Sequence, residues 1–371
     1  MQRAKRFLLR PRGVLAGGLF LPLTLASYLY GFGCQVRAEA HRMGVLRSRR
    51  LPCRVISVGN LTVGGTGKTP VVIYLASFLA KHGRKVGVVS RGYGREGNEE
   101  TLLVSDGREV LVGPARAGEE PYLIARRLPG TPIMVAKDRV KGGEALCRRF
   151  GIDTLLLDDG FQHLRLYRDV DLLLIDATDP FGNGYLLPRG ILREPFSALS
   201  RAHAILLTRM DQHGPVIPDR LQALLREIAR GHPLPVLRSS FSPVMLLSLT
   251  DGKEHPVGTL RGKRWFLFSG IGNPPSFRRT VEQWGGEVVG ERSFGDHFRY
   301  SERVLQRLER DVEGAAPDGV LTTEKDAVKV EPLLAPRGSK WPYFALRMDL
   351  AEVEEKGLFE GLILGGKAGF P

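Results

Sequence analysis

The segment that most constrains the fold is RVISVGNLTVGGTGKTPVVIYLASFLAKHG, residues 54–83. Its apolar, β-branched run Val55–Val58 is typical of a buried strand. The polar, glycine-rich stretch Asn60–Gly67 follows as a turn, and Pro70–Lys81 carries apolar residues at helical spacing. A proline near a helix start costs little, because its missing N–H would have no partner there. The order of strand, glycine-rich loop, Lys-Thr and helix predicts a phosphate-binding loop.

Each part of this loop has a chemical purpose. Glycines let backbone N–H groups curl around phosphates, and the following helix N-terminus adds positive charge. Lys68 would reach the β/γ-phosphates, and the Thr69 hydroxyl would bind Mg²⁺. The strict G-x-x-x-x-G-K-[ST] pattern needs glycine where this chain has Thr62, so the prediction depends on the strand–loop–helix context; the alternative is a glycine-rich turn with a chance Lys-Thr pair. The predicted nucleotide-binding residues are Thr62, Val63, Gly64, Gly65, Thr66, Gly67, Lys68 and Thr69.

Strand-like and helix-like segments alternate to about residue 210, which predicts a parallel, doubly wound sheet. The further strands that we expect are Lys85–Ser90, Thr154–Leu157, Asp171–Ile175 and Ala204–Leu207. The 371 residues suffice for two domains and an appendage. Three cysteines without C-x-x-C spacing indicate neither a disulfide framework nor a zinc site, and favour a reducing compartment.

An acidic pair follows the predicted strand Thr154–Leu157. Asp158 and Asp159 stand at the carboxyl end of that strand, where phosphate-loop enzymes place the acid that organises Mg²⁺. Adjacent residues point to different sides, so one carboxylate would serve the metal and the other a neighbouring base or lysine. The pattern does not say which. A surface turn is the alternative, since Asp-Asp-Gly also suits a turn.

A second polar element, Thr208-Arg209-Met210-Asp211, follows the strand Ala204–Leu207. It approximates the [NT]-K-x-D element by which GTPases read guanine, with Arg209 in place of lysine. A membrane-bound NTPase that acts as a switch or chaperone is therefore one hypothesis, and it predicts nucleotide hydrolysis without transfer to an acceptor, and a preference for guanine. A surface turn after a strand explains the tetrapeptide equally well.

The first fifty residues carry most of the excess charge. They hold ten Lys or Arg and one acid, which is +9 of the net +14. Between Arg12 and Arg37 runs the uncharged stretch Val14–Gly33, 20 residues long and about the length that crosses a bilayer core. Cationic clusters on both sides leave its orientation open under the positive-inside rule. We expect a membrane anchor that binds anionic lipid, and whether it spans the bilayer or lies in one leaflet stays open.

Other interpretations of this N-terminus compete. Ala38-Glu39-Ala40 resembles a signal-peptide cleavage site, although the apolar run is longer than a usual signal core. A buried helix hairpin is the other alternative. A basic protein can also bind nucleic acid, but here the charge lies beside an apolar segment instead of among interleaved aromatic residues. We therefore predict no nucleic-acid partner.

Several motifs together resemble the tetraacyldisaccharide 4′-kinase family of lipid A biosynthesis in Gram-negative bacteria. They cover the chain from about residue 10 to 350, in order, and read SVGNLTVGGTGKTP, SRGYGR, GEEPYLIA, LLDDGFQH, GYLLPRGILREP, SGIGNPPSF, FGDHFRY and TTEKDAVK. The resemblance implies an α/β fold: a P-loop NTPase-like doubly wound sheet, a second, smaller α/β domain and an N-terminal membrane-associated helix. The implied domains are 1–35 (membrane-associated), 36–235 (nucleotide-binding), 236–350 (smaller α/β) and 351–371 (C-terminal tail or helix).

The resemblance also implies a reaction. The γ-phosphate of ATP would move, with Mg²⁺, to the 4′-hydroxyl of a tetraacylated glucosamine disaccharide 1-phosphate on the cytoplasmic face of the inner membrane. The two domains would be joined by linker strands, Val236–Leu249 and Pro342–Asp349. The implied partners are the lipid disaccharide and an anionic membrane surface, and we expect a monomer. Acyl-chain preference stays open.

Site residues follow from the matched motifs. The resemblance places Lys68 and Thr69 on the triphosphate and metal, and Asp158 and Asp159 on the family's acidic pair. Its catalytic histidine matches His297, and the partner acid of a G-D-E-P motif matches Glu119, because this chain reads Gly-Glu-Glu-Pro. Glu119 would accept the sugar proton with His297 as orienter or relay. The predicted catalytic residues are Glu119, His297, Lys68 and Asp159; the predicted metal ligands are Thr69, Asp158 and Asp159; the predicted substrate-binding residues are Arg91, Tyr93, Asn183, Arg193 and Glu194.

Overall fold

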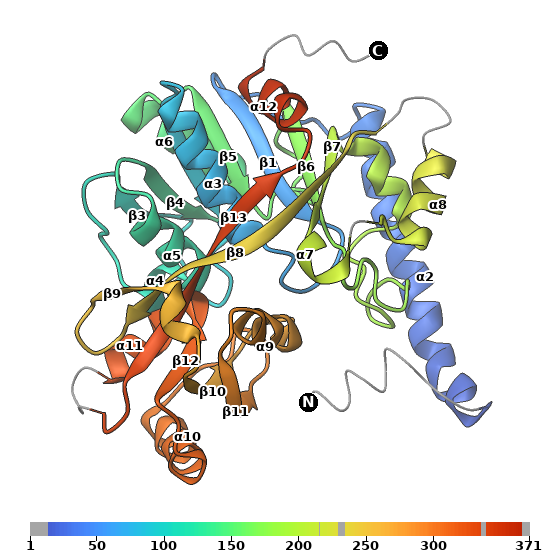
Figure 1. Cartoon of the computed structure of the whole chain (residues 1–371). Helices are drawn as coiled ribbons and strands as arrows, with labels where there is room; N and C mark the ends of the chain where they lie inside the picture. Colours follow the sequence, from blue (N-terminus) through green and yellow to red (C-terminus); the bar gives the residue numbers. More distant parts are fainter. Residues whose placement is uncertain (1–13, 215, 229–233, 335–338, 366–371) are drawn as a thin grey trace.

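One mixed sheet of thirteen strands runs through the whole molecule (Figure 1). This computed structural model describes residues 14–214, 216–228, 234–334 and 339–365. The basic positions before residue 13 and the end of the predicted tail, 366–371, lie outside the described residues. The strand order is β11-β10-β12-β13-β8-β7-β6-β1-β5-β2-β4-β3, with β9 paired to β8.

The strands have the following bounds: β1 Arg54–Asn60, β2 Val86–Ser90, β3 Thr101–Asp106, β4 Pro132–Ala136, β5 Thr154–Asp158, β6 Val170–Asp176, β7 Ala204–Thr208, β8 Val236–Ser248, β9 Glu254–Pro256, β10 Arg264–Ser269, β11 Glu287–Ser293, β12 Gly319–Thr323 and β13 Tyr343–Val353. The helices are α2 Val14–Arg42, α3 Lys68–Lys81, α4 Pro114–Ala117, α5 Glu119–Arg127, α6 Arg139–Phe150, α7 Met210–His213, α8 Asp219–Ile228, α9 Pro274–Gln283, α10 Glu302–Ala315, α11 Glu324–Leu334 and α12 Lys356–Leu364. The described residues also form two 3-10 helices, η1 Phe196–Arg201 and η2 Val257–Leu260.

The strands on either side of β1 are parallel, as the alternating pattern predicts. β1 pairs in parallel with β5 and β6, and β2 pairs in parallel with β5 and β4. Only the edge strand β3 runs antiparallel to its neighbour in this part of the sheet. The predicted strands are confirmed as β1, β2, β5, β6 and β7, and the fold class is confirmed as α/β.

Two long antiparallel strands, β8 and β13, join the halves of the sheet. Their register runs from Ser248↔Phe344 to Ser239↔Val353. At one end β8 pairs with β7, and at the other β13 pairs with β12, so the sheet continues from one half to the other. Figure 1 shows both strands crossing the molecule as a diagonal. They coincide with the predicted linker strands, while the exact domain limits stay a prediction.

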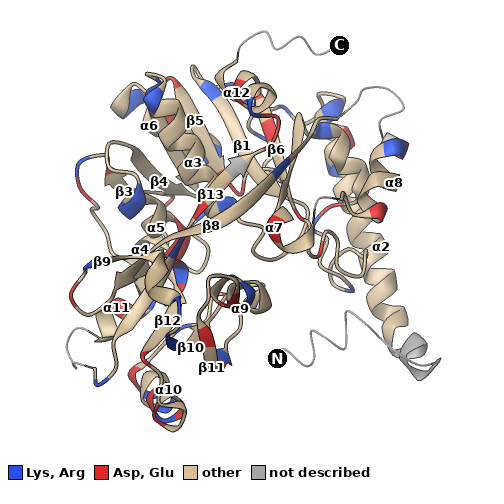
Figure 2. Cartoon of the chain, viewed as in Figure 1, with Lys and Arg blue, Asp and Glu red and all other residues tan. Residues whose placement is uncertain are grey.

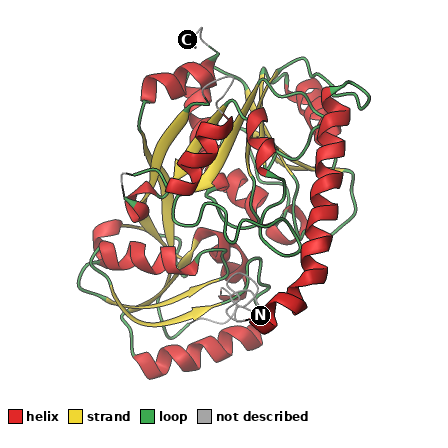
Figure 3. Cartoon of the chain, turned by 90° about the vertical axis from the view of Figure 1, so that its right-hand side faces the viewer, coloured by secondary structure: helices red, strands yellow, loops and turns green. Residues whose placement is uncertain are grey.

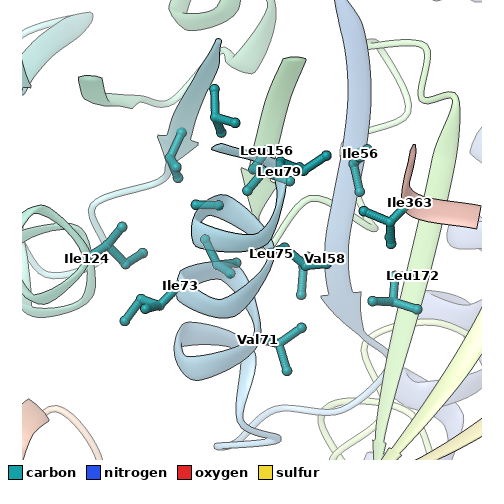
Figure 4. Close-up of a cluster of buried hydrophobic side chains, with 14 of the residues drawn as sticks. Ile56, Val58, Val71, Ile73, Leu75, Leu79, Ile124, Leu156, Leu172 and Ile363 are labelled. Atoms are coloured by element: carbon teal, nitrogen blue, oxygen red, sulfur yellow. The ribbon is translucent and has the colours of Figure 1, made fainter. Parts of the chain in front are cut away.

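The central strands are buried on both faces, so alternate residues enter different cores. Ile56 and Val58 pack with Val71 and Leu75 of α3, and α12 covers the same face (Figure 4). Val55 points to the opposite face, where α6 covers the sheet. The nucleotide-loop helix is therefore fixed by its apolar stripe against the strand that precedes it.

Helix α2 lies along the edge of the nucleotide-loop half (Figure 3). It contains Pro22 and extends nine residues beyond the predicted apolar run, through Arg42. Two hydrogen bonds tie it to the 184–193 loop: Ser27 Oγ donates to Leu186 O at 2.8 Å and Tyr30 Oη to Arg193 O at 2.8 Å. Among the described residues, no helix is long and apolar enough to cross a bilayer.

Candidate active site

A cavity of about 800 Å³ lies where the two halves of the sheet face each other. The carboxyl ends of parallel strands β1, β5, β2 and β7 open into it, which is where open α/β sheets bind ligands. The nucleotide-loop half contributes residues 62–70, Ser90, Arg91, Tyr93, Asp158, Asp159, Arg193, Arg209 and Asp211. The other half contributes Phe241, Gly272, Asn273, Asp296, His297, Thr323, Glu324 and Lys325.

The glycine-rich loop forms an open cradle. Gly67 caps α3 in the left-handed conformation, at φ 85°, and a Cβ there would overlap the ring of Phe241. Gly64 has φ 132°, and a Cβ added to it would meet no atom within 4 Å. The loop backbone is thus shaped by glycine and leaves free space in front of it, as phosphate binding requires.

The tetrapeptide Thr208-Arg209-Met210-Asp211 at the end of β7 supports this cradle through hydrogen bonds to its backbone. Thr208 Oγ1 donates to Thr66 O at 3.1 Å, and Arg209 Nη2 donates to Gly65 O at 2.9 Å. Arg209 also forms an ion pair with Asp176. Arg209 is therefore engaged in holding the loop, while Asp211 lines the cavity.

Lys68, in the first turn of α3, lies among the predicted polar partners. Its Nζ is 3.6 Å from Asp159 Oδ1 and donates to Asn60 Oδ1 at 3.3 Å. Arg193 Nη1 reaches both oxygens of Asp159, at 2.8 and 3.0 Å. Arg193 is brought there because residues 61–63 pair with residues 191–193 through Val63 N to Ile191 O, at 2.7 Å, and Arg193 N to Leu61 O, at 2.7 Å.

The two adjacent aspartates differ in environment. Burial opposes the ionisation of Asp159, but the charges of Lys68 and Arg193 outweigh it and lower its pKa to about 2. Burial and the charge of Glu120 raise the pKa of Asp158, against the hydrogen bond from Ser90 Oγ at 2.7 Å. Asp159 is therefore an ionised carboxylate beside the loop, and the charges of Lys68 and Arg193 balance its own. Asp158 is a buried carboxyl group that accepts one hydrogen bond, from Ser90.

The donor set fits a magnesium–nucleotide complex. Asp158 Oδ1 and Thr66 Oγ1 are buried and have no hydrogen-bond partner among the described residues. Carboxylate and hydroxyl oxygens suit Mg²⁺, which in kinase sites usually takes one or two carboxylates and completes its shell with phosphates and water. Within the described part of the chain, no cluster of three or more His, Cys, Asp or Glu side chains is arranged to hold a metal alone.

The predicted catalytic pair is brought together across the two halves. His297 Nδ1 lies 3.3 Å from Glu119 Oε2, too poorly aligned for a full hydrogen bond, and neither atom has another partner among the described residues. Catalytic hydrogen bonds are often loose before substrate binds. Burial opposes the ionisation of Glu119, but His297, Lys329 and Lys325 outweigh it and lower its pKa. The longer side chain of glutamate thus reaches the histidine.

Three residues around the cavity have left-handed backbones that non-glycine residues rarely adopt. They are Asp159 at φ 53°, Arg209 at φ 60° and His297 at φ 57°. Each such conformation costs on the order of 1–3 kcal/mol and persists where the surroundings impose it. Local sequence gives no signal for this conformation at any of the three.

Two lysines of α11 were missed as site residues. Lys325 Nζ contacts Glu120 Oε1 at 3.1 Å and Asp296 Oδ1 at 3.2 Å, and Lys329 Nζ contacts Glu119 Oε1 at 3.3 Å. Both lie in the motif TTEKDAVK, which marks the family resemblance but carries no chemistry by itself. Lys325 is 205 residues from Glu120 and 29 residues from Asp296 in the sequence, so only the fold reveals the contacts.

The predicted substrate-binding residues divide between the cavity and its surroundings. Arg91 and Tyr93 line it, and the Tyr93 ring packs on His297 with centroids 5.0 Å apart. Asn183 shapes the 183–190 loop by donating to Arg189 O at 3.0 Å. Glu194 is buried, pairs with Arg201 at 2.8 Å, and faces a second cavity of about 1100 Å³ beneath α2.

The chain is similar to known proteins in both sequence and fold. Residues 19–363 match the family model described as Tetraacyldisaccharide-1-P 4'-kinase. A tetraacyldisaccharide 4'-kinase of Syntrophus aciditrophicus is 41% identical over 317 residues, covering 84% of this chain and 85% of that protein. One from Anaeromyxobacter sp. (strain Fw109-5) is 41% identical over 360 residues, covering 95% of both. The crystal structure of LpxK from Aquifex aeolicus in complex with ATP superposes with a TM-score of 0.72 at 33% identity, covering 94% of this chain and 98% of that one.

Proposed function

The chain belongs to the tetraacyldisaccharide-1-P 4'-kinase family, and we propose that the cavity between its two halves is where the transfer takes place. It is an ATP-dependent kinase that phosphorylates the 4′ position in lipid A biosynthesis. The acceptor is a tetraacylated glucosamine disaccharide 1-phosphate, and the donor is the γ-phosphate of ATP. The observation that carries the assignment to this cavity is that Lys68 and His297, from opposite halves, line it together.

Residues 62–69 bind the triphosphate in this proposal. Phosphoryl transfer needs in-line placement and charge neutralisation more than covalent help from the protein. Backbone N–H groups of the open loop and Lys68 Nζ supply that charge, and Asp159 keeps Lys68 in place before the nucleotide arrives. Thr69, Asp158 and Asp159 would hold Mg²⁺, which when bound neutralises charge on the phosphates.

The proton of the sugar hydroxyl passes to the Glu119–His297 pair. His297 lines the cavity, whereas Glu119 lies one layer behind it against Nδ1. This arrangement supports His297 Nε2 as the first acceptor and Glu119 as the carboxylate that orients and stabilises the imidazole, the logic of a hydroxyl–histidine–acid relay. The sequence interpretation gave Glu119 the first role, so the two assignments differ in order and agree on the pair.

The acceptor sugar enters beside Arg91, Tyr93 and Arg193. Arg193 is already paired with Asp159, so its side chain is fixed before substrate binds. Its carbonyl also accepts from Tyr30 of α2 at 2.8 Å, so the acceptor end of the cavity adjoins the N-terminal helix. Asn183 and Glu194 would act indirectly, by shaping the 183–194 segment.

The N-terminal helix is the proposed membrane contact. Its exposed apolar side chains recur at helical spacing and form one stripe: Leu21, Leu25, Tyr28, Leu29, Phe32 and Val36. Figure 2 shows this helix without charges along most of its length and with basic residues at its end. An apolar stripe followed by arginines suits a helix that lies in the interface of an anionic membrane. We place it, as a monomer, on the cytoplasmic face of the inner membrane.

The two halves would act as separate domains, within limits near 36–235 and 236–350. Glu119 belongs to the first and His297 to the second, so the pair is complete only when the domains are closed. Closure also excludes water from the phosphates. Residues 351–365 return to the first domain, where Phe359 and Ile363 of α12 join its core.

A radiolabelled-ATP assay with the lipid disaccharide tests the proposal. We expect label in the lipid with the wild-type protein, none without lipid, and almost none with Lys68→Ala or His297→Ala. Competition with unlabelled GTP should be weaker than with unlabelled ATP. Nucleotide hydrolysis that proceeds equally without lipid, or a preference for GTP, would favour the rival NTPase switch and overturn the proposed site.

A further inference from the structure

We propose that Lys325 and Lys329 are positioning residues for phosphoryl transfer, which fix the tautomer of His297 and the orientation of Glu119. The proposal rests on the catalytic role of that pair. The two lysines stand four residues apart on α11, so they lie on one face of the helix. That face meets the N-terminus of α5, where Glu119 and Glu120 begin the helix.

Lys325 uses all three of its donors around His297. Its Nζ lies 3.1 Å from Glu120 Oε1, 3.2 Å from Asp296 Oδ1 and 3.5 Å from His297 Nε2. Burial opposes its charge, but Glu120 and Asp296 outweigh burial and raise its pKa, so it stays an ammonium group. An ammonium group has donors only, so the nitrogen that faces it must carry a lone pair.

The tautomer of His297 follows from that contact. If Nε2 carries the lone pair in the neutral ring, the proton resides on Nδ1. Nδ1 lies 3.3 Å from Glu119 Oε2, where a donor is required because a carboxylate only accepts. Lys325 therefore keeps Nε2 unprotonated, and the sugar hydroxyl displaces the Lys325 N–H from the single Nε2 lone pair when it delivers its proton there.

Lys329 fixes the carboxylate on the other side of the ring. Its Nζ lies 3.3 Å from Glu119 Oε1, 3.0 Å from Asp326 Oδ1 and 3.0 Å from Phe298 O. Glu119 is thus paired at Oε1 with Lys329, which turns Oε2 toward His297. Because Phe298 follows His297 in the chain, Lys329 also ties the histidine loop to α11.

Ion pairs that do not involve Lys325 or Lys329 also join α5 and α11. At the other end of the same interface Arg127 Nη1 pairs with Glu324 at 2.8 Å and also contacts Asp349, and Arg126 pairs with Glu331. Glu324 lines the cavity, but neither Arg126 nor Glu331 does, and Arg126 is more exposed than Lys325 or Lys329. Arg126→Gln is therefore a matched control that removes an ion pair of the interface without touching the catalytic pair.

A direct test is the tautomer of His297 by nitrogen-15 NMR on protein labelled at its eight histidines, with His297→Gln identifying the signal. We expect an Nδ1–H ring in the wild type and in Arg126→Gln, and a mixed or Nε2–H ring in Lys325→Met. Because Lys325→Met leaves two carboxylates without their partner and could fail to fold, Lys325→Met/Asp296→Asn serves as a charge-balanced second variant. An Nε2–H ring in the wild type, or an unchanged ring in either folded variant, overturns the proposal.

Kinetics supply the second readout. We expect Lys325→Met and Lys329→Met to lower kcat by about 10–100-fold, with KM for ATP nearly unchanged. A misplacement of the catalytic groups by up to about one ångström causes a rate loss of that size. The groups that face His297 are Glu119, Glu120, Asp296, Lys325 and the Tyr93 ring, with Lys329 and Asp326 behind. Removing Lys325 from this set makes it more negative, so the acid limb of the kcat profile should move to higher pH. Lys329→Arg should restore most of the activity lost in Lys329→Met.

These outcomes separate the positioning role from the proposed function. If the wild type transfers no phosphate to the lipid, the proposed function fails while the NMR result still stands. If the wild type is active and Lys325→Met matches Arg126→Gln in kcat and in the acid limb, the positioning role fails and the function stands. A loss of kcat that simply follows a loss of thermal stability would likewise count against positioning.

Discussion

Shortening Glu119 by one methylene is the sharpest probe of the catalytic pair. Both oxygens of Glu119 lie 3.3 Å from their partners, His297 Nδ1 and Lys329 Nζ. A C–C bond is about 1.5 Å long, so in Glu119→Asp the carboxylate would retreat to about 4.8 Å from His297 if the backbone stayed in place. That distance is beyond hydrogen-bond range. A Cβ added to Gly118 would lie only 3.2 Å from Gly92 Cα, so the backbone before Glu119 runs close to Gly92 and has little room for a compensating shift.

The magnitude follows from reach and charge taken separately. A misplacement of about one ångström can cost a factor of about 100, so we expect kcat of Glu119→Asp to fall by about that factor, or about 2.7 kcal/mol of transition-state stabilisation. Glu119→Gln keeps the reach but loses the charge, and its amide can turn a donor toward Nδ1–H. A neutral partner that imposes the wrong tautomer can cost a factor of about 10⁴. The aspartate variant should therefore remain measurably active, unlike the glutamine variant.

Initial rates of labelled phosphate transfer at saturating ATP and lipid check this order, with His297→Ala and the double variant Glu119→Gln/His297→Ala alongside. If the two residues act as one unit, the double variant should be little worse than the worse single one. KM for ATP should stay within about threefold, because neither group is assigned to the triphosphate. A Glu119→Gln enzyme that matches the wild type would refute the reasoning and turn attention to Glu120 or Asp159.

Three further predictions concern other parts of the molecule. Lys68→Ala should leave a protein that unfolds at the wild-type temperature and transfers almost no phosphate, and near-normal turnover of the purified variant would contradict the phosphate-loop assignment. Changing Leu25, Leu29 and Phe32 to Gln should weaken sedimentation with anionic vesicles at least tenfold, because each buried apolar side chain contributes about 1.5–3 kcal/mol; unchanged partitioning would exclude this stripe as the membrane contact. Burial lowers the pKa of His163 from 6.5 to about 4, with help from Arg139, so the unfolded chain binds the proton first. The free energy of unfolding should fall as pH drops from 6.5 to 4, by about 1–2 kcal/mol at pH 5 after allowance for partial exposure, and urea titrations of His163→Gln should lack that part of the fall.

Much of the fold could be predicted because local patterns determine it. Strands β5 and β7 both begin at the predicted residue, and each ends one residue later than predicted. Helix α3 starts at Lys68, two residues before the predicted start, because Gly67 in the left-handed conformation caps it. Helix α2 continues nine residues beyond the apolar run Val14–Gly33, to Arg42, because charged residues are also good helix formers and hydropathy does not mark where a helix ends.

The site could be predicted only in part, since its contacts join distant residues. The loop at Lys68 and the acids at Asp158 and Asp159 carry their signal in the strand that precedes them. The positioning roles proposed for Lys325 and Lys329 have no such local signal, because nothing near them in the sequence specifies Glu119 or Glu120 as partners. The order of proton transfer that we propose for Glu119 and His297 likewise has no signal in the sequence, since it depends on which of the two lines the cavity.

The charges of α5 explain how one approach of the two halves is selected over others. Its N-terminus carries Glu119 and Glu120, and its C-terminus carries Arg126 and Arg127. This order also complements the helix dipole, which favours acids first and bases last. Helix α11 presents Lys325 and Lys329 to the first pair and Glu324 and Glu331 to the second, so an approach shifted toward the C-terminus of α5 would place lysines against arginines. An exposed pair such as Arg126–Glu331 adds little to stability, whereas the enclosed pairs at the cavity end lose much if one partner is removed. The same contacts therefore also place Glu119 against His297, and the proposed catalytic pair is complete only in this arrangement of the two halves.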